Sequence, residues 1–410
     1  MNDVHIIGIG MTRLGKHLQN SVKSLVREAV DRALADAGCE VDAIQAAWFC
    51  NTRQGIFEGQ HGIRGQVALR PLGLQGIPVF NTDNACASSA AGLHLARSYI
   101  LSGCVDMALV VGAEKMNFPG RERDMYDAFK GSTDVELAAA HRQRVIDAAS
   151  DFPGPVQTAP AAQSVFMQSY SAQARLHMKR YGTTQRQIAA VAQKNHWNSQ
   201  FNPNAQYQVA MDIEAILADK LISWPLTRSM CAPMSDGACA ILLCSGRALA
   251  RFDQHRAIPI VASQVTTGVP HALEDADLAV GRIAADRAFQ EAGLGPREVD
   301  VAEVHDASAF GELKQIENLR FCDVGDSGAI TERGETALTG RLPVNPSGGL
   351  LSKGHPIGAT GAIQIHELVT QLRGEAGARQ VEGARVAVAE NGGGAYDGEE
   401  AVACVTILKR

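Results

Sequence analysis

One cysteine lies where a thiol can act as a nucleophile. Cys86 stands in the segment Asn84–Ala90 (NACASSA), between a short extended piece and the start of a helix. The unpaired N–H groups and the dipole at a helix start favour a thiolate. A buried structural cysteine is the ordinary alternative. Because the flanking alanines and serines leave open space, we predict that Cys86 is a nucleophile.

A histidine follows a glycine-dense loop in the last quarter of the chain. His355 lies in the segment Asn345–Gly361 (NPSGGLLSKGHPIGATG), which runs into a helix with Pro356 near its first turn. Glycines let a backbone approach a ligand closely. The loop alone could bind a phosphate or form a tight corner. A histidine placed just before the helix is harder to explain by packing, and it indicates an active site.

A second histidine follows a predicted strand. His305 comes directly after Val299–Val304, at the carboxyl edge of a sheet, where the ligand sites of α/β proteins gather. An edge histidine with satisfied hydrogen bonds explains this position equally well. His305 is therefore a candidate site residue, and its role depends on which groups surround it in the fold.

The last glycine run also follows a strand. It spans Glu390–Ala395 (ENGGGA), and its backbone N–H groups could stabilise a developing oxyanion. The candidate donors are Asn391, Gly392, Gly393 and Gly394. The alternative is a tight turn without a catalytic role.

The segments that must position these residues have the pattern of parallel sheets covered by helices. Short apolar runs alternate with longer segments of helical period, so we expect an α/β fold. The expected strands are Val4–Ile9, Ala46–Cys50, Pro78–Asn81, Met107–Val111, Ala238–Leu243, Ile258–Gln264, Val299–Val304, Arg385–Ala389 and Ala401–Leu408. The expected helices are Val22–Ala37, Ala87–Leu101, Ala161–Tyr181, Thr183–Asn198, Leu273–Ala292, Ala309–Leu319 and Ile357–Leu372.

The order of elements at the start of the chain recurs from Ile258 onward, which predicts an internally duplicated fold. At 410 residues the chain is also longer than one compact core usually grows. We expect a first half at residues 1–250 and a second half at residues 251–410. The first half contains an inserted segment at about 113–230, and insertions of that size are usually lids or binding loops.

Composition argues against several classes of protein. Lys and Arg number 38 against 44 Asp and Glu, and no basic cluster interleaves with aromatics, so we expect no nucleic-acid partner. The N-terminus does not resemble a signal peptide, and no apolar stretch reaches the roughly 20 residues that span a bilayer. The nine cysteines are an odd number without a CxxC pair. We therefore expect a cytoplasmic protein with neither disulfides nor a metal site.

Taken together, these pieces resemble the thiolase superfamily. A nucleophilic cysteine, a strand-end motif, a GHP motif and a terminal glycine turn occur here in that family's order, and Gly354–Pro356 is the most specific of them. The match covers nearly the whole chain and is weakest from about residue 112 to 160. The stretches that look like the sterol-carrier-protein-2 type of thiolase are Lys194–His196, Asn202–Pro203, Pro225–Thr227, Ser235–Ala238 and His305–Asp306.

The resemblance implies a thiolase fold, with five αβαβα layers built from two similar halves and an inserted loop domain over coenzyme A. Cys86 would take the acyl group, and His355 would accept its proton. His305, with a water or with His355, would hold one thioester oxygen, while N–H groups of Cys86 and of Gly392–Gly394 would hold the other. Coenzyme A is then a substrate or product, no cofactor is bound covalently, and a homodimer is expected.

The sequence departs from the family where thiolases carry a second reactive cysteine for the α-carbon proton. Its two usual positions hold Ala307 and Asn391, and neither side chain is a general acid or base. Three functions stay open. The first is a C-acyltransferase acting on 3-ketoacyl-CoA, in which His355, His305 or a substrate group moves this proton. The second is a specialised thiolase or aldol lyase that acts with a small OB-fold and zinc-finger partner on bulky aromatic or steroid side-chain CoA esters. The third is a non-catalytic CoA-binding subunit.

Overall fold

The fold alternates strands and helices along the chain. The computed structural model describes residues 3–152 and 164–410. The strands are β1 Val4–Met11, β2 Ala46–Cys50, β3 Val79–Thr82, β4 Met107–Glu114, β5 Leu221–Ser223, β6 Leu226–Thr227, β7 Gly237–Ser245, β8 Ile258–Thr267, β9 Val301–Glu303, β10 Val386–Gly393 and β11 Val402–Lys409. The helices are α1 Val22–Ala37, α2 Gln54–Glu58, α3 Arg64–Leu69, α4 Ser88–Leu101, α5 Glu122–Lys130, α6 Ala138–Ala148, α7 Val165–Tyr181, α8 Gln185–Ser199, α9 Ile213–Ala218, α10 Val280–Ala292, α11 Ala309–Asn318, α12 Ser327–Glu332 and α13 Thr360–Arg373. No helix in these ranges is long and apolar enough to cross a membrane.

Equivalent strands of the two halves lie in mirror order on either side of one seam. The main sheet has the order β3-β2-β4-β7-β1-β8-β11-β10-β9, and β1 pairs with β8 in antiparallel fashion at the seam. In each half, the first strand lies at the seam (β1 and β8), and the last strand lies next to it (β7 and β11). The remaining strands of each half follow outward. A parallel bridge from Val344 to Ala302 of β9 occupies the place that β3 has in the first half. This order confirms the predicted duplication.

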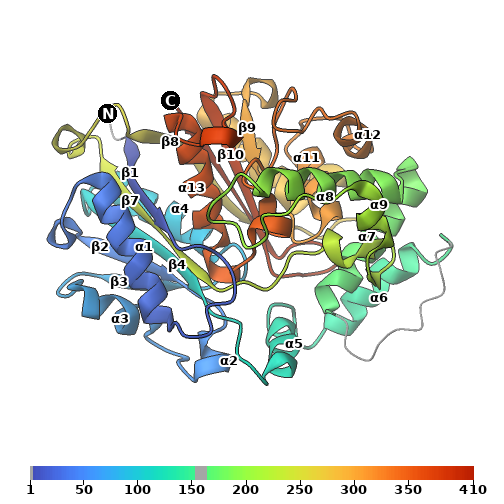
Figure 1. Cartoon of the computed structure of the whole chain (residues 1–410), viewed down its shortest axis with the longest axis horizontal. Coiled ribbons are helices and arrows are strands. Elements are labelled where there is room, and N and C mark those ends of the chain that lie inside the picture. The colour runs from blue at the N-terminus through green and yellow to red at the C-terminus, as the bar shows by residue number, and fades with distance from the viewer. Residues whose placement is uncertain (1–2, 153–163) are drawn as a thin grey trace.

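In Figure 1, α13 lies in the middle of the molecule, and α1 and α3 lie on the side of the first half. Helices α4 and α13 share one apolar core with strands of both halves, whereas α1 and α10 pack on the outer faces. Strand β10 shows why both faces are apolar: Ala387 and Ala389 join the central core, while Val386 and Val388 join the core beneath α10. Strands buried on both faces are typical of sheets covered by helices. The five predicted layers are therefore present.

Between β4 and β7 the chain leaves the sheet and forms helices α5 to α9. The teal and green helices of this segment gather at one side of the molecule in Figure 1. The predicted helix at Thr183–Asn198 is α8, and the one at Ala161–Tyr181 is α7, of which residues 161–163 lie outside the described residues. Helices α5 and α6 were not predicted, because five of the nine residues of α5 are charged and four of the six apolar residues of α6 are alanines.

Most predicted boundaries lie within a few residues of the structure, and α1 and β2 have the predicted bounds. The predicted start of the helix that ends at Ala292 is wrong, because the segment Leu273–Ala279 does not belong to that helix. Helix α10 begins at Val280, and its backbone N–H donates to the Glu399 carboxylate at 2.9 Å. This cap comes from a residue far away in sequence, so no local pattern reveals it.

Candidate active site

Cys86 lies in a tight loop between β3 and α4. The preceding Ala85 has a φ of +50°, in the left-handed region that few non-glycine residues adopt. The Ser88 hydroxyl donates to the Ala85 carbonyl at 2.6 Å and accepts the N–H of Asn84 at 2.9 Å. These bonds hold the loop in its conformation. Helix α4 then begins at Ser88, two residues after the thiol.

Three of the predicted site residues come together. The reactive atoms of Cys86, His305 and His355 lie within 4.8 Å of one another. The ring centroids of the two histidines are 5.5 Å apart. The cysteine comes from the first half of the chain and both histidines come from the second. The site therefore depends on the packing of the two halves against each other.

These residues line a cavity of about 1100 Å³. This volume exceeds the roughly 300–1,000 Å³ of most small-molecule sites, so the cavity suits a long ligand. Much of its wall is apolar and comes from the inserted segment, including Met116, Phe118, Phe129, Phe166, Met167, Met211, Leu221 and Ile222. Cationic side chains also line it, among them Lys16, Lys220 and Arg228. The lining fits a ligand with an apolar part and an anionic part.

The Cys86 thiol holds its proton tightly because it is enclosed by protein. Burial raises the pKa of Cys86 to about 12, against the lowering effects of the Arg53 guanidinium and the Gly394 backbone N–H. The predicted stabilisation of a thiolate by the helix start is therefore outweighed by burial. Burial, His305 and Arg53 together lower the pKa of His355 well below 6.5, so this imidazole is neutral. Transfer of the proton from Cys86 to His355 would give a thiolate next to an imidazolium. Each charge would then offset the cost of burying the other, because opposite charges stabilise each other.

A buried arginine that the sequence analysis did not single out lies close to the thiol. The Arg53 guanidinium donates to the Ala128 carbonyl at 2.7 Å and to the Ser132 hydroxyl. Its Nε has no hydrogen-bond partner among the described residues. Arg53 lines the same cavity as Cys86. Its positive charge therefore favours negative charge on the sulfur or on a ligand beside it.

A buried glutamate, also missed by the sequence analysis, ties the Arg53 loop to the His355 segment. The Glu114 carboxylate accepts the backbone N–H of Arg53 at 2.9 Å and that of Gly358 at 3.0 Å. Glu114 ends β4, and Arg53 follows the neighbouring parallel strand β2. Polar residues at the carboxyl ends of adjacent parallel strands are the signal that could have identified both.

The hydrogen bonds of His355 select one tautomer. Its Nδ1 lies 2.8 Å from the Thr360 hydroxyl, which itself donates to the Pro356 carbonyl at 3.3 Å. When the Thr360 proton is directed at Pro356, the hydroxyl oxygen accepts from Nδ1, which then carries the imidazole proton. Nε2 is then unprotonated and free to accept a proton. Thr360 thus orients the His355 ring.

Replacing Thr360 by valine is expected to slow modification of Cys86 about tenfold, the effect of one lost hydrogen bond of about 1.4 kcal/mol. The measurement is the rate of Cys86 alkylation by iodoacetamide as a function of pH. Thr360→Ser keeps the hydroxyl and is expected to restore the rate. Equal rates for the valine variant and the wild type would show that the Thr360 bond does not control the tautomer.

His305 is buried but keeps both ring nitrogens available. Its backbone N–H donates to the Glu390 carboxylate at 3.0 Å, while Nδ1 and Nε2 have no partner among the described residues. Burial lowers the pKa of His305 to about 4, although the nearby Glu400 opposes this. The ring is therefore neutral, with one N–H to donate. Such a donor suits a carbonyl oxygen in the cavity, and this is not the satisfied edge histidine of the alternative.

The final glycine run lies mostly in a strand. Strand β10 continues through Asn391, Gly392 and Gly393, so only Gly394, with a φ of +65°, lies in the turn. Gly394 lines the cavity, and its N–H points to the sulfur of Cys86. The other three predicted residues lie behind the cavity wall among the described residues. Gly393 packs so closely that an added Cβ would lie 2.3 Å from the Asn84 carbonyl.

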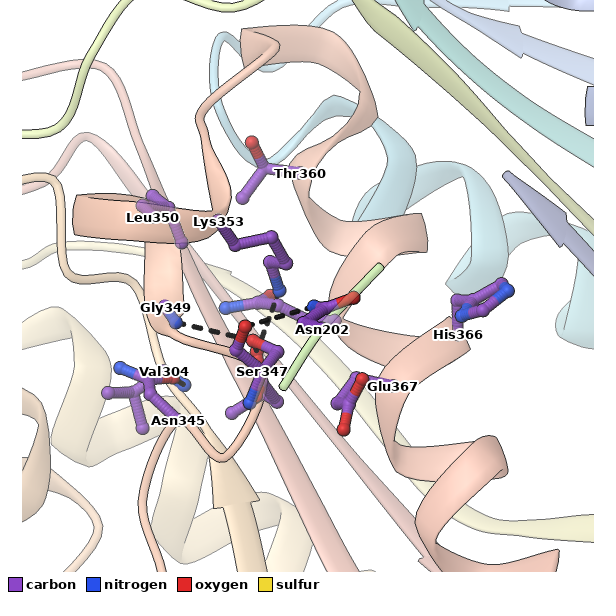
Figure 2. Close-up of polar contacts among 12 residues, drawn as sticks. Asn202, Val304, Asn345, Ser347, Gly349, Leu350, Lys353, Thr360, His366 and Glu367 are labelled. Carbon is purple, nitrogen blue, oxygen red and sulfur yellow. Dashed lines mark hydrogen bonds and ion pairs between the residues drawn. The ribbon is translucent and has the colours of Figure 1, made fainter. Parts of the chain in front are cut away.

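A buried ion pair supports the glycine-dense loop before His355. Lys353 Nζ lies 2.9 Å from the Glu303 carboxylate, and both side chains are almost fully buried. The Ser347 hydroxyl donates to the same carboxylate at 2.8 Å. Figure 2 shows Ser347 and Lys353 converging from the two ends of the loop. Because Glu303 ends β9 just before His305, the pair connects the positions of both histidines.

Breaking this pair is expected to cost stability. Glu303→Gln leaves the buried Lys353 charge without its ion-pair partner, and the expected loss is about 3 kcal/mol of unfolding free energy. Urea unfolding measures it. The control is Asp127→Asn, which removes an exposed pair with Lys130 and is expected to cost less than about 1 kcal/mol. Similar losses for the two variants would contradict a structural role of the buried pair.

Comparison with known proteins places the whole chain in one group. Residues 4–213 match the family described as thiolase, N-terminal domain, and residues 262–410 match the thiolase C-terminal domain-like family. The acetyl-CoA acetyltransferase of Methanothermobacter thermautotrophicus is 36% identical over 400 residues, which cover 96% of this chain and 97% of that protein. Sterol carrier protein 2 of Bos taurus is 34% identical over 405 residues, covering 95% of this chain and 70% of that protein.

Solved structures share the fold at lower identity. The Ltp2-ChsH2(DUF35) aldolase has a TM-score of 0.77 at 20% identity, covering 100% of this chain and 98% of that one. Human mitochondrial 3-ketoacyl-CoA thiolase in complex with CoA has a TM-score of 0.70 at 15% identity, with the same coverage. At these identities the likeness concerns the fold alone.

Proposed function

Since this chain belongs to the thiolase family and is an acyltransferase, we propose that it cleaves or forms a 3-ketoacyl-CoA through an acyl group carried on Cys86. The observation that supports this most is the convergence of the Cys86, His305 and His355 reactive atoms within 4.8 Å. They meet inside a cavity whose lining suits a long, partly anionic ligand. A binding-only subunit would have no need of a nucleophile and a neutral base at this distance.

Each group then has a task that follows from its position. His355 Nε2 takes the proton of Cys86, and the sulfur attacks the thioester carbonyl carbon. A new C–S bond forms on Cys86 while the coenzyme A thiol leaves with the proton. The N–H groups of Cys86 and Gly394 lie at the sulfur and donate to the oxygen that gains negative charge. His305 donates to the oxygen of the second thioester.

We place the domain limits at residues 1–250 and 251–410, with the insertion at about 113–230 over the coenzyme A site. A homodimer is part of the same proposal. Strand β3 ends the sheet and pairs only with β2 in the described residues, and its Phe80 is 41% exposed. An open edge of this kind can pair with its copy across a two-fold axis. Light scattering after gel filtration tests it. The free cysteines fit a reducing compartment such as the cytoplasm.

The test of the acyl-enzyme is intact-protein and peptide mass spectrometry after mixing the chain with acetyl-CoA and with longer or aromatic acyl-CoAs. An acyl group on the Cys86 peptide is the expected result, and the donor that gives it begins to identify the substrate. Prior treatment with EDTA is expected to change nothing, which separates a nucleophile from a metal ligand. The absence of an adduct with every donor would overturn the proposal.

One observation favours a second candidate. Neither Ala307 nor Asn391 can act on an α-carbon proton, and a solved structure with this fold is an aldolase named with a second component, ChsH2(DUF35). An aldol lyase on a bulky CoA ester, acting with an OB-fold and zinc-finger partner, needs no acyl-enzyme. It would release an aldehyde or ketone without a Cys86 adduct. Product analysis therefore separates it from acyl transfer.

A further inference from the structure

A tyrosine from the inserted segment reaches the reactive end of the cavity. Tyr170 of α7 lines the same cavity as Cys86, His305 and His355 and is only 6% exposed. Its ring packs against the start of α11, where an added Cβ on Gly311 would lie 3.5 Å from the ring. That stretch follows His305 directly. The phenol is therefore a proton-bearing group next to the residues that handle the thioesters.

A buried polar cluster lies beside the Tyr170 phenol. The Glu400 carboxylate accepts from Lys314 Nζ at 3.0 Å and from Gln315 Nε2 at 3.3 Å. The same Lys314 Nζ donates to Gln173 of α7 at 3.2 Å, one turn after Tyr170, and Glu400 is the nearby charge that acts most strongly on the Tyr170 phenol. Burial opposes ionisation of Glu400, but the charges of Lys314 and His305 and the hydrogen bonds to the carboxylate together outweigh it and lower the pKa of Glu400. The cluster thus places a cation and a carboxylate beside a phenol that faces the cavity.

The phenol also lies within electrostatic range of the nucleophile. Burial raises the pKa of Tyr170 well above 10, and the charges of Glu400 and of the Cys86 thiolate raise it further. Tyr170 is therefore protonated, and only a proton transfer relayed to Glu400 makes its oxygen basic. A phenol backed by a carboxylate can both take and give a proton at a fixed point.

We propose that Tyr170 and Glu400 carry the α-carbon proton, in place of the cysteine that is absent from positions 307 and 391. The inference rests on the proposed function, because this proton moves only if a carbon–carbon bond is made or broken here. In bond formation the α-C–H bond breaks and its electron pair enters the thioester enolate. The proton binds Tyr170 Oη, whose own proton passes to a Glu400 oxygen.

The remaining steps balance without another reactant. The enolate carbon attacks the acyl carbonyl on Cys86, the new carbon–carbon bond forms, and the C–S bond breaks to return the thiolate. Cleavage is the reverse, beginning with the proton on Glu400. Tyr170 then protonates the departing α-carbon and is reprotonated from Glu400.

Cys231 is the rival group and also the matched control. It lines the cavity and lies close to Ala307, because the neighbouring Ala232 N–H donates to the Ala307 carbonyl at 3.0 Å. Its thiol donates to the Thr227 carbonyl at 3.3 Å, and burial and Asp219 raise the pKa of Cys231 to about 12. Beside Tyr170 lies the Glu400 carboxylate, which can take a proton. The Cys231 thiol is instead hydrogen-bonded to the Thr227 carbonyl, which cannot. The two residues make opposite predictions for the same experiment.

The experiment measures two steps separately in the full-length chain. Acetyl-CoA or propionyl-CoA is incubated with the enzyme in D₂O, and mass spectrometry follows deuterium in the recovered thioester and the acyl adduct on Cys86. Tyr170→Phe is expected to slow α-proton exchange at least about a hundredfold, the loss typical of a missing general acid or base, while its acylation rate stays within about threefold of wild type. Glu400→Gln keeps an acceptor for the phenol but cannot take its proton, and it is expected to slow exchange likewise. Cys231→Ala is expected to exchange normally.

Three results for proton exchange would overturn the inference. Normal exchange in Tyr170→Phe, loss of exchange in Cys231→Ala, or no exchange in the wild type would exclude Tyr170 as the proton carrier. Loss of both acylation and exchange in Tyr170→Phe would indicate a structural role. Wild-type exchange that depends on Tyr170 but occurs without a Cys86 adduct would instead overturn the acyl-enzyme and leave the Tyr170 assignment standing.

Discussion

Cys86→Ala is expected to lose acyl transfer by at least about four decades, because the sulfur that would carry the acyl group is gone and no other step can replace it. The fold is expected to stay intact, since alanine keeps the Cβ and the loop is held by bonds of Ser88 with Asn84 and Ala85. Steady-state turnover of acyl-CoA substrates measures the loss. Circular dichroism and thermal melting measure the fold.

The control for this variant is another free thiol. Cys104 is exposed and lies outside the cavity lining of the described residues, so Cys104→Ala is expected to keep both turnover and the adduct. A Cys86→Ala protein that still turns over at the wild-type rate would remove Cys86 from the mechanism. Turnover that is lost together with the native melting transition would point to folding instead.

The fold was predictable from sequence where apolar period and local caps agree. Helix α1 is an example, because its period is clear and Gly38 ends it with a φ of +64°. The start of α10 was not predictable, since its cap is the Glu399 carboxylate from the other end of that half. The boundary of β10 also failed, because the glycines after Glu390 continue the ladder opposite β11 where a turn was expected. In both cases a contact between residues far apart in the sequence sets the boundary of the element.

A site residue was predictable only where its own position in the sequence, at the end of a strand or the start of a helix, indicates a functional role. Cys86, His305 and His355 each stand at the end of an element in the sequence, and the structure brings them together. Tyr170 has no such signal, and the position of Arg53 shortly after β2 is an incomplete one by itself. Arg53 becomes notable only once β2 and β4 are known to be adjacent, and Tyr170 sits on an ordinary helix of the inserted segment. Their importance depends on how the insertion covers the two halves.

His355→Ala is expected to slow acylation of Cys86 by about two to four decades, the usual range for a lost general base. Burial holds the pKa of the thiol at about 12, so without a neighbouring imidazole very little thiolate forms. Rapid mixing with acyl-CoA followed by mass spectrometry gives the rate of adduct formation. The control is His366→Gln, because burial also lowers the pKa of His366 to about 4, yet Figure 2 shows this residue on α13, away from the loop that carries His355.

The pH dependence offers a second test of the same assignment. The unprotonated form of His355 persists down to its lowered pKa, so wild-type acylation is expected to stay level near pH 6.5 and to fall only well below it. In that window the unfolded chain binds a proton at this histidine and the folded chain does not, so stability is lost as the pH falls below 6.5. His355→Ala removes one such group and is expected to lose less stability on acidification. An acylation rate within about tenfold of wild type, together with an unchanged acid stability profile, would mean that another group is the base.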